Sequence, residues 1–326
     1  MSERHGRWSR QLRQGQDPLI LEVGRVAPQV KGSVLLTAGR NVLLVTAVSR
    51  PEPATDLGFF PLTVEYREKM AGAGRIPGGF LRREARAGNH EILGSRVVDR
   101  TVRPFFPDGF MCETQILATV MSFDPEGDAE VMAITGASAA LTVSEIPWGG
   151  PVAGVRVARV QGEMRLFPTR MEREMADLDL LVSVSRQGLV MVEGSAGEVP
   201  EETLLEALAV AGEGATSLLE VQEEMRADRG AEKRIFQASG IDPVVREKAT
   251  AVLRPRIDEL FAAQPKHRRH EIGAELITAV EEVLTPDDAE ETGRTGQADL
   301  AESALGSSEI GGAKEPQGMR PAVPGL

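Results

Sequence analysis

The chain is poor in cysteine, aromatic residues and histidine, and each shortage excludes a class of site. Its one cysteine in 326 residues, Cys112, excludes an internal disulfide and a thiolate metal cluster, and it is typical of a reducing compartment. Aromatic residues make up only 4%, so the core must consist mainly of Val, Leu, Ala and Ile. None of the four histidines stands with carboxylates at ligand spacing, and we expect no metal or nucleophile site at His5, His90, His267 and His270.

Several familiar sequence patterns are also missing. No apolar run approaches the length of a membrane span, and "MSERHGRWSRQLRQGQ" at the N-terminus lacks the apolar core of a signal peptide, so we predict a cytoplasmic protein. The stretch "GAGRIPG" (72–78) is one residue off the dinucleotide fingerprint, and "EGSAG" (193–197) has Glu193 where a nucleophile elbow has glycine. These patterns therefore give no support to dinucleotide or serine-hydrolase chemistry.

Positive charge is scarce but concentrated. The chain has 49 acidic and 37 basic residues and a net charge of −12, which disfavours general affinity for nucleic acid. Between Arg75 and Arg103, however, seven arginines stand against three acidic residues, and no lysine occurs. A guanidinium group offers a rigid fork of donors that grips phosphate oxygens and also stacks on bases. The segment therefore indicates a site for a polyanion.

Two interpretations of this segment stay open. Glycines at 72, 74, 78 and 79 allow the backbone to approach a ligand closely, and Phe80 beside Arg82 suits stacking on the bases of a single-stranded nucleic acid. The alternative is that the arginines pair with the surplus carboxylates as structural salt bridges and that Phe80 is a core residue. The sequence alone does not separate the two.

The remaining patterns predict an α+β fold followed by a small all-α module. Short β-branched runs bounded by turn residues predict strands at 19–26, 32–39, 41–49, 59–68, 114–123, 154–160, 163–168, 178–186 and 188–194, the first three of them antiparallel. Helical patterns cover 90–106, 129–146, 199–225, 242–263 and 268–284. The small residues at 136–139 indicate a helix packed closely on a sheet. We divide the chain into a core (1–228), a helical linker domain (229–285) and a tail (286–326) whose composition predicts disorder.

Four stretches carry a family resemblance: "GFFPLTVEYREKMAGAGRIPGGFLRRE", "RVVDRTVRPFFPDGF", "ATVMSFDPEGDAEVMAITGASAAL" and "EIPWGGPVAGVRV". Together they resemble the first RNase PH-like core of bacterial polynucleotide phosphorylase (polyribonucleotide nucleotidyltransferase), and 242–284 resembles that family's linker. The resemblance covers residues 12 to 284. It implies a ribosomal-protein-S5-domain-2-like core in a ring-shaped homo-trimer, which releases nucleoside diphosphates from the 3′ end of RNA in mRNA degradation and RNA processing.

The resemblance also implies which residues bind RNA. A channel-narrowing loop that holds single-stranded RNA would consist of Phe80, Leu81, Arg82 and Arg83, and the phosphates would be tracked by Arg86, Arg96, Arg100 and Arg103. The family usually has a second phenylalanine where Leu81 stands, so one stacking partner differs here.

Catalysis belongs to the second core in this family, and we expect no catalytic or metal-binding residue in this chain. By resemblance, the phosphate grip of the second core falls on residues 127–130, which include Asp128 and Glu130, and its two metal-binding aspartates fall on Asp177 and Met171. Carboxylates repel phosphate, and a thioether is a poor ligand for Mg²⁺. We therefore expect Mg²⁺ and phosphate only in a second core, which a separate chain could carry.

Three functions follow as hypotheses. The first is the RNA-binding and assembly half of a phosphorolytic 3′-to-5′ exoribonuclease, inactive alone. The second is a non-catalytic RNA-binding or regulatory subunit. The third is a scaffold whose arginines only bridge subunits. Steep salt dependence of RNA binding would separate the first two from the third.

Overall fold

The computed structural model describes residues 8–14, 17–53, 59–80, 82–84, 86–236, 242–264 and 266–284. The described residues divide into two compact units, the first ending at residue 236 and the second beginning at residue 242. Leu81 and the predicted tail at 286–326 lie outside the described residues. No helix within the described ranges combines the length and the hydropathy that crossing a bilayer requires.

The first unit opens with a six-stranded sheet in the order β1-β2-β3-β4-β6-β5. Its strands are β1 (Trp8–Gln14), β2 (Asp17–Val23), β3 (Gly32–Ala38), β4 (Asn41–Ser49), β5 (Leu62–Glu68) and β6 (Thr114–Ser122). The predicted antiparallel pairing of β2, β3 and β4 is confirmed, whereas β5 runs parallel to β6. The strand β1 was not predicted, because "WSRQLRQ" is mostly polar. Its large apolar anchor is Trp8, which is buried and whose indole Nε1 donates to Asp228 at 2.9 Å. This contact is distant in sequence, so no local pattern indicates it.

A second, four-stranded sheet has the order β10-β9-β7-β8, with antiparallel neighbours throughout. It consists of β7 (Val152–Val160), β8 (Glu163–Leu166), β9 (Leu178–Ser185) and β10 (Gly188–Ala196), and the short helix α3 (Arg170–Glu174) connects β8 to β9. The four strands correspond to the four predicted in this part of the chain.

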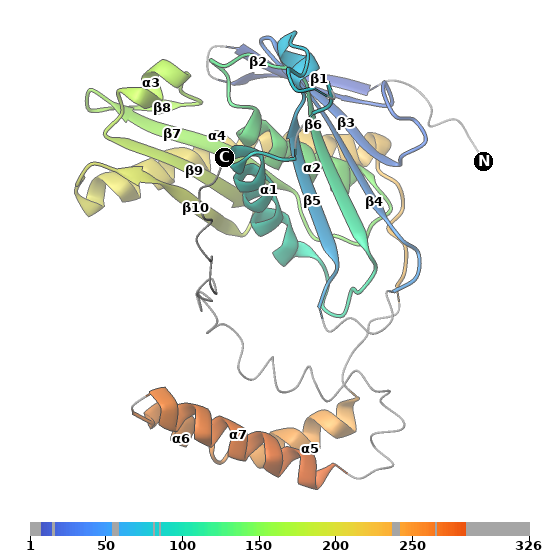
Figure 1. The fold of residues 1–326 in the computed structure, drawn as a ribbon, viewed down its shortest axis with the longest axis vertical. Coiled ribbons are helices and arrows are strands. Elements are labelled where there is room, and N and C mark those ends of the chain that lie inside the picture. Colours follow the sequence, from blue (N-terminus) through green and yellow to red (C-terminus); the bar gives the residue numbers. More distant parts are fainter. Residues whose placement is uncertain are drawn as a thin grey trace, which may run out of the picture. The chain divides into compact units, whose positions relative to one another are not determined.

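Helices α1 (Asn89–Val102) and α2 (Ala129–Val143) lie between the two sheets (Figure 1). Opposite residues of an antiparallel pair share a face, so Gly154 and Ser183 point to the same side of the second sheet. Ser183 exchanges a 2.8 Å hydrogen bond with Thr101 of α1, and Gly154 lies against Ile134 of α2. The long helix α4 (Glu201–Arg229) packs along β7 and β9.

Helix α2 is the centre of the core, since every residue except Glu130 is buried. Its small side chains let the first sheet approach closely, which confirms the prediction made for residues 136–139. A Cβ atom on Gly136 would lie 2.6 Å from Val45 Cγ2 and 2.8 Å from Leu36 Cδ1, and both of these side chains are fully buried.

We expect Gly136→Ala to destabilise the protein by about 1–3 kcal/mol, because the added methyl group overpacks the contact between α2 and the sheet. The free energy of unfolding in urea measures this effect. Gly212→Ala is the matched control, since nothing lies within 4 Å of a Cβ at this position of α4, and there we expect stabilisation of up to about 1 kcal/mol. A Gly136→Ala variant as stable as wild type would contradict the close packing.

The second unit, in its described residues, consists of helices α5 (Pro243–Leu253), α6 (Ile257–Ala262) and α7 (Lys266–Val283). The predicted apolar face of α7 is confirmed, since Ile272, Leu276 and Val280 are buried, and both α5 and α6 contact α7. Exposed ion pairs such as Arg268–Glu271 lie on its surface.

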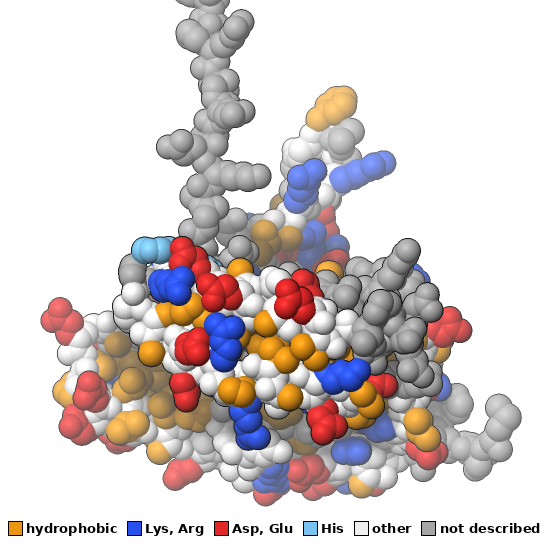
Figure 2. All heavy atoms as spheres, turned by 90° about the horizontal axis from the view of Figure 1, so that it is seen from below, with side chains coloured by type: hydrophobic (Ala, Val, Ile, Leu, Met, Phe, Trp, Pro, Cys, Tyr) orange, Lys and Arg blue, Asp and Glu red, His pale blue; other side chains and the backbone are white. Residues whose placement is uncertain are grey.

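Figure 2 shows a face of the molecule on which acidic and basic side chains are interspersed, so the acidic excess does not form one large negative area there.

Candidate nucleic-acid interface

The arginine-rich loop, which we define as residues 74–88, connects β5 to α1. It follows a 3₁₀ turn, η1 (Met70–Ala73), whose Gly72 carbonyl accepts a 3.0 Å hydrogen bond from Phe123 N at the end of β6. Gly74 then adopts a left-handed conformation with φ +67°, which glycine tolerates without strain. Further along, Arg82 N donates to Gly79 O at 2.9 Å, and Arg82 itself has φ +47°.

The loop presents its functional side chains to solvent. Phe80 is fully exposed, at 101% of its reference area, so the interpretation of Phe80 as a core residue is wrong. Five arginines are exposed and make no ion pair or side-chain hydrogen bond with any other residue that the structure describes: Arg75, Arg82, Arg83, Arg86 and Arg96. The first four lie in the arginine-rich loop and the fifth on α1. Arg75 was counted in the charge cluster but not among the predicted RNA-binding residues.

The three acidic residues of the segment do not neutralise these five arginines. Glu84 accepts from Lys69 Nζ at 2.8 Å and from Met70 N at 3.0 Å. Glu91 accepts from the backbone N–H groups of Glu68 and Gly88, and the bond to Gly88 fixes the start of α1. Only Asp99 binds an arginine of the segment, Arg103. Although the chain has more acidic than basic residues, most of the arginines in this segment therefore have no carboxylate partner among the described residues.

Arg100 and Arg103 differ from the other arginines of the segment because each has a carboxylate partner among the described residues. Arg100 Nη1 lies 3.1 Å from Glu193 of β10, with both side chains half exposed, and an exposed pair of this kind adds little stability. Arg103 binds Asp99 at 2.6 Å and donates to the carbonyls of Phe60 and Leu62. The salt-bridge interpretation therefore describes Arg103 well, and the assignment of both residues to RNA stays a prediction.

The N-terminus of α2 is the place that by resemblance corresponds to the phosphate grip of a second core. Asp128 already caps this helix by accepting from Val131 N at 3.2 Å. It shares Arg156 with Glu130 and Asp179, whose carboxylates lie 3.5 Å and 3.0 Å from the guanidinium. Burial, and then the charge of Asp128, raise the pKa of Glu130. A phosphate at this helix end would meet carboxylates in place of free N–H groups.

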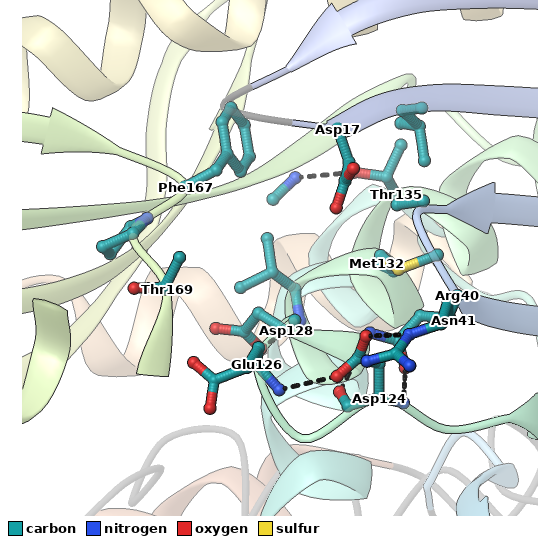
Figure 3. Close-up of a pocket in the computed structure, with 16 residues that line it drawn as sticks. Asp17, Arg40, Asn41, Asp124, Glu126, Asp128, Met132, Thr135, Phe167 and Thr169 are labelled. Carbon is teal, nitrogen blue, oxygen red and sulfur yellow. Dashed lines mark hydrogen bonds and ion pairs between the residues drawn. The ribbon is translucent and has the colours of Figure 1, made fainter. Parts of the chain in front are cut away.

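A pocket beside the same helix end is also acidic (Figure 3). It is lined by Asp17, Asp124, Glu126 and Asp128 around an apolar floor that includes Met132. Its cation, Arg40, donates to Asp124 at 2.8 Å, and this bond lowers the pKa of Asp124. Because the lining is acidic and no described residue of the arginine-rich loop contributes to it, the pocket is a poor site for phosphate.

The two positions predicted to correspond to metal-binding aspartates lie near α3. Met171 is exposed on that helix, and Asp177 is paired with Arg159 at 3.6 Å. Within the described ranges, no group of three or more His, Cys, Asp or Glu side chains is arranged to hold a metal ion. The residues present here therefore do not fit a Mg²⁺ site.

The chain matches two parts of one protein family. The profile "3′ exoribonuclease family, domain 1" matches residues 17–147, and domain 2 of the same family matches residues 150–214. The first range contains β2 to β6 with α1 and α2, and the second contains all four strands of the second sheet. The two profiles therefore follow the division between the two sheets.

Curated relatives extend over more of the chain. The polyribonucleotide nucleotidyltransferase of Anaeromyxobacter dehalogenans is 44% identical over 303 residues, which cover 91% of this chain and 41% of the relative. That of Myxococcus xanthus is 46% identical over 258 residues, covering 79% and 36%. The chain thus spans about two fifths of the length of these relatives. Among solved structures, rice (Oryza sativa) Rrp46 matches with a TM-score of 0.49 and 14% identity, covering 68% of this chain and 93% of that chain.

Proposed function

This chain belongs to the 3′ exoribonuclease family, with an RNase PH-like α+β core, and from that premise we propose that it is the RNA-binding and assembly half of a phosphorolytic 3′-to-5′ exoribonuclease. The observation that supports the proposal most directly is the set of five exposed arginines without a described partner, four of them in one loop of an acidic chain. A loop that only bridged the chain's own carboxylates would have its guanidinium groups paired.

The proposed ligand is single-stranded RNA. The arginines Arg82, Arg83, Arg86 and Arg96 would bind successive phosphates, since guanidinium donors match phosphate oxygens. The exposed ring of Phe80 would stack on a base, which is a contact that every base can make. A homo-trimeric ring would bring the loops of three subunits around one strand, and this assembly is part of the proposal.

Catalysis, in this proposal, belongs to a core other than the one formed by the described residues up to 236. By resemblance, Asp128 and Glu130 would stand where a second core has its phosphate grip, and both carboxylates pair with Arg156 here. In the second core, phosphate would attack the terminal phosphodiester beside Mg²⁺, which neutralises charge on the phosphoryl oxygens. The part of this chain is to hold the RNA strand and to supply the ring surfaces.

Binding of a fluorescein-labelled oligo(A) to the purified chain tests the RNA-binding part. We expect the logarithm of the association constant to fall with the logarithm of salt concentration with a slope of about −3, because four arginine–phosphate contacts on a single strand release about 0.7 counterions each. Fluorescence anisotropy across a salt series measures the slope. Absence of binding at low salt would contradict the proposal and favour the scaffold hypothesis.

We also predict no phosphorolysis of poly(A) by the chain alone. The assay is ADP formation with phosphate and Mg²⁺, using protein from a host strain that lacks its own polynucleotide phosphorylase. ADP formation that depends on both phosphate and Mg²⁺ would refute the prediction. Stimulation of a separately produced second core supports the half-enzyme, whereas RNA binding without stimulation favours the regulatory subunit.

A further inference from the structure

Glu84 has a special place in the arginine-rich loop, because its side chain connects the middle of the loop to the rest of the chain, a contact that we call the tether. Its carboxylate accepts from Lys69 Nζ at 2.8 Å and from Met70 N at 3.0 Å. Among the described residues from 76 to 87, no other side chain makes a hydrogen bond or ion pair outside the loop. The Arg82–Gly79 bond lies within the loop itself.

The far end of the tether is held firmly. Lys69 directly follows β5, and Met70 begins η1. The turn is bound to β6 through Gly72, whose carbonyl accepts from Phe123 N. A Cβ atom on Gly72 would lie 3.0 Å from Val120 O, so the turn also packs tightly on that strand. Glu84 therefore connects the loop to the sheet through two residues that are themselves fixed.

The tether also separates charges. The pKa of Glu84 is lowered, mainly by the hydrogen bond from Lys69. This carboxylate is therefore ionised at neutral pH. Its charge is compensated by Lys69, while the neighbouring arginines have no described carboxylate partner. A glycine-rich loop without such a fixed point would lose more conformational freedom when it binds a strand.

We propose that Glu84, through Lys69 and Met70, is a positioning residue that holds the arginine-rich loop in its RNA-binding conformation. The proposal rests on the proposed function, since it assumes that this loop binds RNA. It leads to an unusual expectation, because removal of a negative charge beside the arginines should weaken the binding of an anion.

The variant Glu84→Gln tests the direction of the effect. Simple electrostatics predicts tighter RNA binding, because one negative charge is lost. The tether predicts binding weaker by about threefold to tenfold, because the loop must then be ordered at the moment of binding. Anisotropy with labelled oligo(A) measures it. Glu65→Gln is the matched control: this exposed residue of β5 makes no side-chain hydrogen bond or ion pair with another described residue, and its neutralisation should leave binding equal or slightly tighter.

Two further variants separate the effect of losing the Glu84–Lys69 contact from the effect of changing the net charge. Lys69→Met/Glu84→Gln keeps the net charge of wild type, and it should still bind as weakly as Glu84→Gln. Lys69→Arg keeps the ion pair, and it should bind like wild type. A double variant with wild-type affinity, or a Glu84→Gln variant that binds more tightly, would overturn the proposal.

Amide hydrogen exchange without RNA distinguishes failure of the tether from failure of the proposed function. The variant Lys69→Met leaves the sequence of the peptide 76–87 unchanged. We expect it to speed amide exchange in that peptide and to leave the exchange of α2 as in wild type. If exchange speeds up but the wild type binds no RNA, the proposed function fails and with it the positioning role. If exchange is unchanged, the tether is absent and the inference is refuted even where RNA binds.

Discussion

Replacement of both Arg82 and Arg83 by alanine will weaken the binding of single-stranded RNA by roughly tenfold to a hundredfold at low salt, since each charge-assisted contact contributes on the order of 1 kcal/mol. Both side chains are exposed and have no described partner, so their loss should not affect folding. The salt slope should become shallower by about 1.4, because two arginine–phosphate contacts are removed. Anisotropy titrations at several salt concentrations give both quantities.

The matched control is Arg165→Ala/Arg186→Ala, which removes the same charge. Each of these arginines is exposed and paired with a glutamate, Arg165 with Glu163 and Arg186 with Glu223. We expect a change of at most about twofold, because salt screens charges that are remote from the bound strand. An equal loss in both double variants would attribute binding to net charge, and no loss in Arg82→Ala/Arg83→Ala would favour the scaffold.

Arg156→Met should destabilise the first unit by about 3–5 kcal/mol, because it leaves buried carboxylates without their cation. The Arg156 side chain is only 12% exposed, and it lies within salt-bridge distance of Asp128, Glu130 and Asp179. Met has a similar volume, so lost packing contributes little. Urea unfolding at pH 7 measures the effect. Arg165→Met, which breaks an exposed pair with Glu163, should cost less than about 1 kcal/mol.

The deficit of Arg156→Met should shrink as the pH is lowered from 7 to 5. Burial and the charge of Asp128 already raise the pKa of Glu130. A group with a raised pKa in the folded state adds stability below its unfolded pKa, and that contribution is lost as the pH rises through the folded pKa. Without Arg156, the pKa of Glu130 rises further, so protonation of this carboxyl group relieves the variant more than the wild type. A deficit that is constant or larger at pH 5 would contradict this explanation.

The regular elements of the fold could be predicted from sequence where their patterns are local. The β-branched runs of both sheets and the small residues of α2 indicate strands and a closely packed helix without knowledge of any partner. The strand β1 could not be found in this way, because its main sign is one buried tryptophan that bonds to Asp228 of α4, 220 residues away. The parallel pairing of β5 with β6 depends on the crossover through α1, which no local pattern specifies.

The candidate site shows the same limit. Its position in the chain follows from the arginine count alone, but the division between paired and unpaired arginines does not. Arg100 meets Glu193, 93 positions further along the chain, and Arg103 donates to two carbonyls just before and at the start of β5. Glu84 looked like one of three neutralising acids, whereas its partners are Lys69 and a backbone N–H group. Spacing along the sequence cannot reveal these choices, because tertiary contacts decide them.

The place of β6 between β4 and β5 has a consequence for how the chain can evolve. The arginine-rich loop follows an edge strand, and it lies between two anchors: the turn η1 before it is bound by Phe123, and Gly88 at its end is bound by Glu91. Substitutions or small insertions between these anchors leave the register of every strand pair unchanged. Ligand preference can therefore diverge in descendants of this gene while the scaffold is inherited intact.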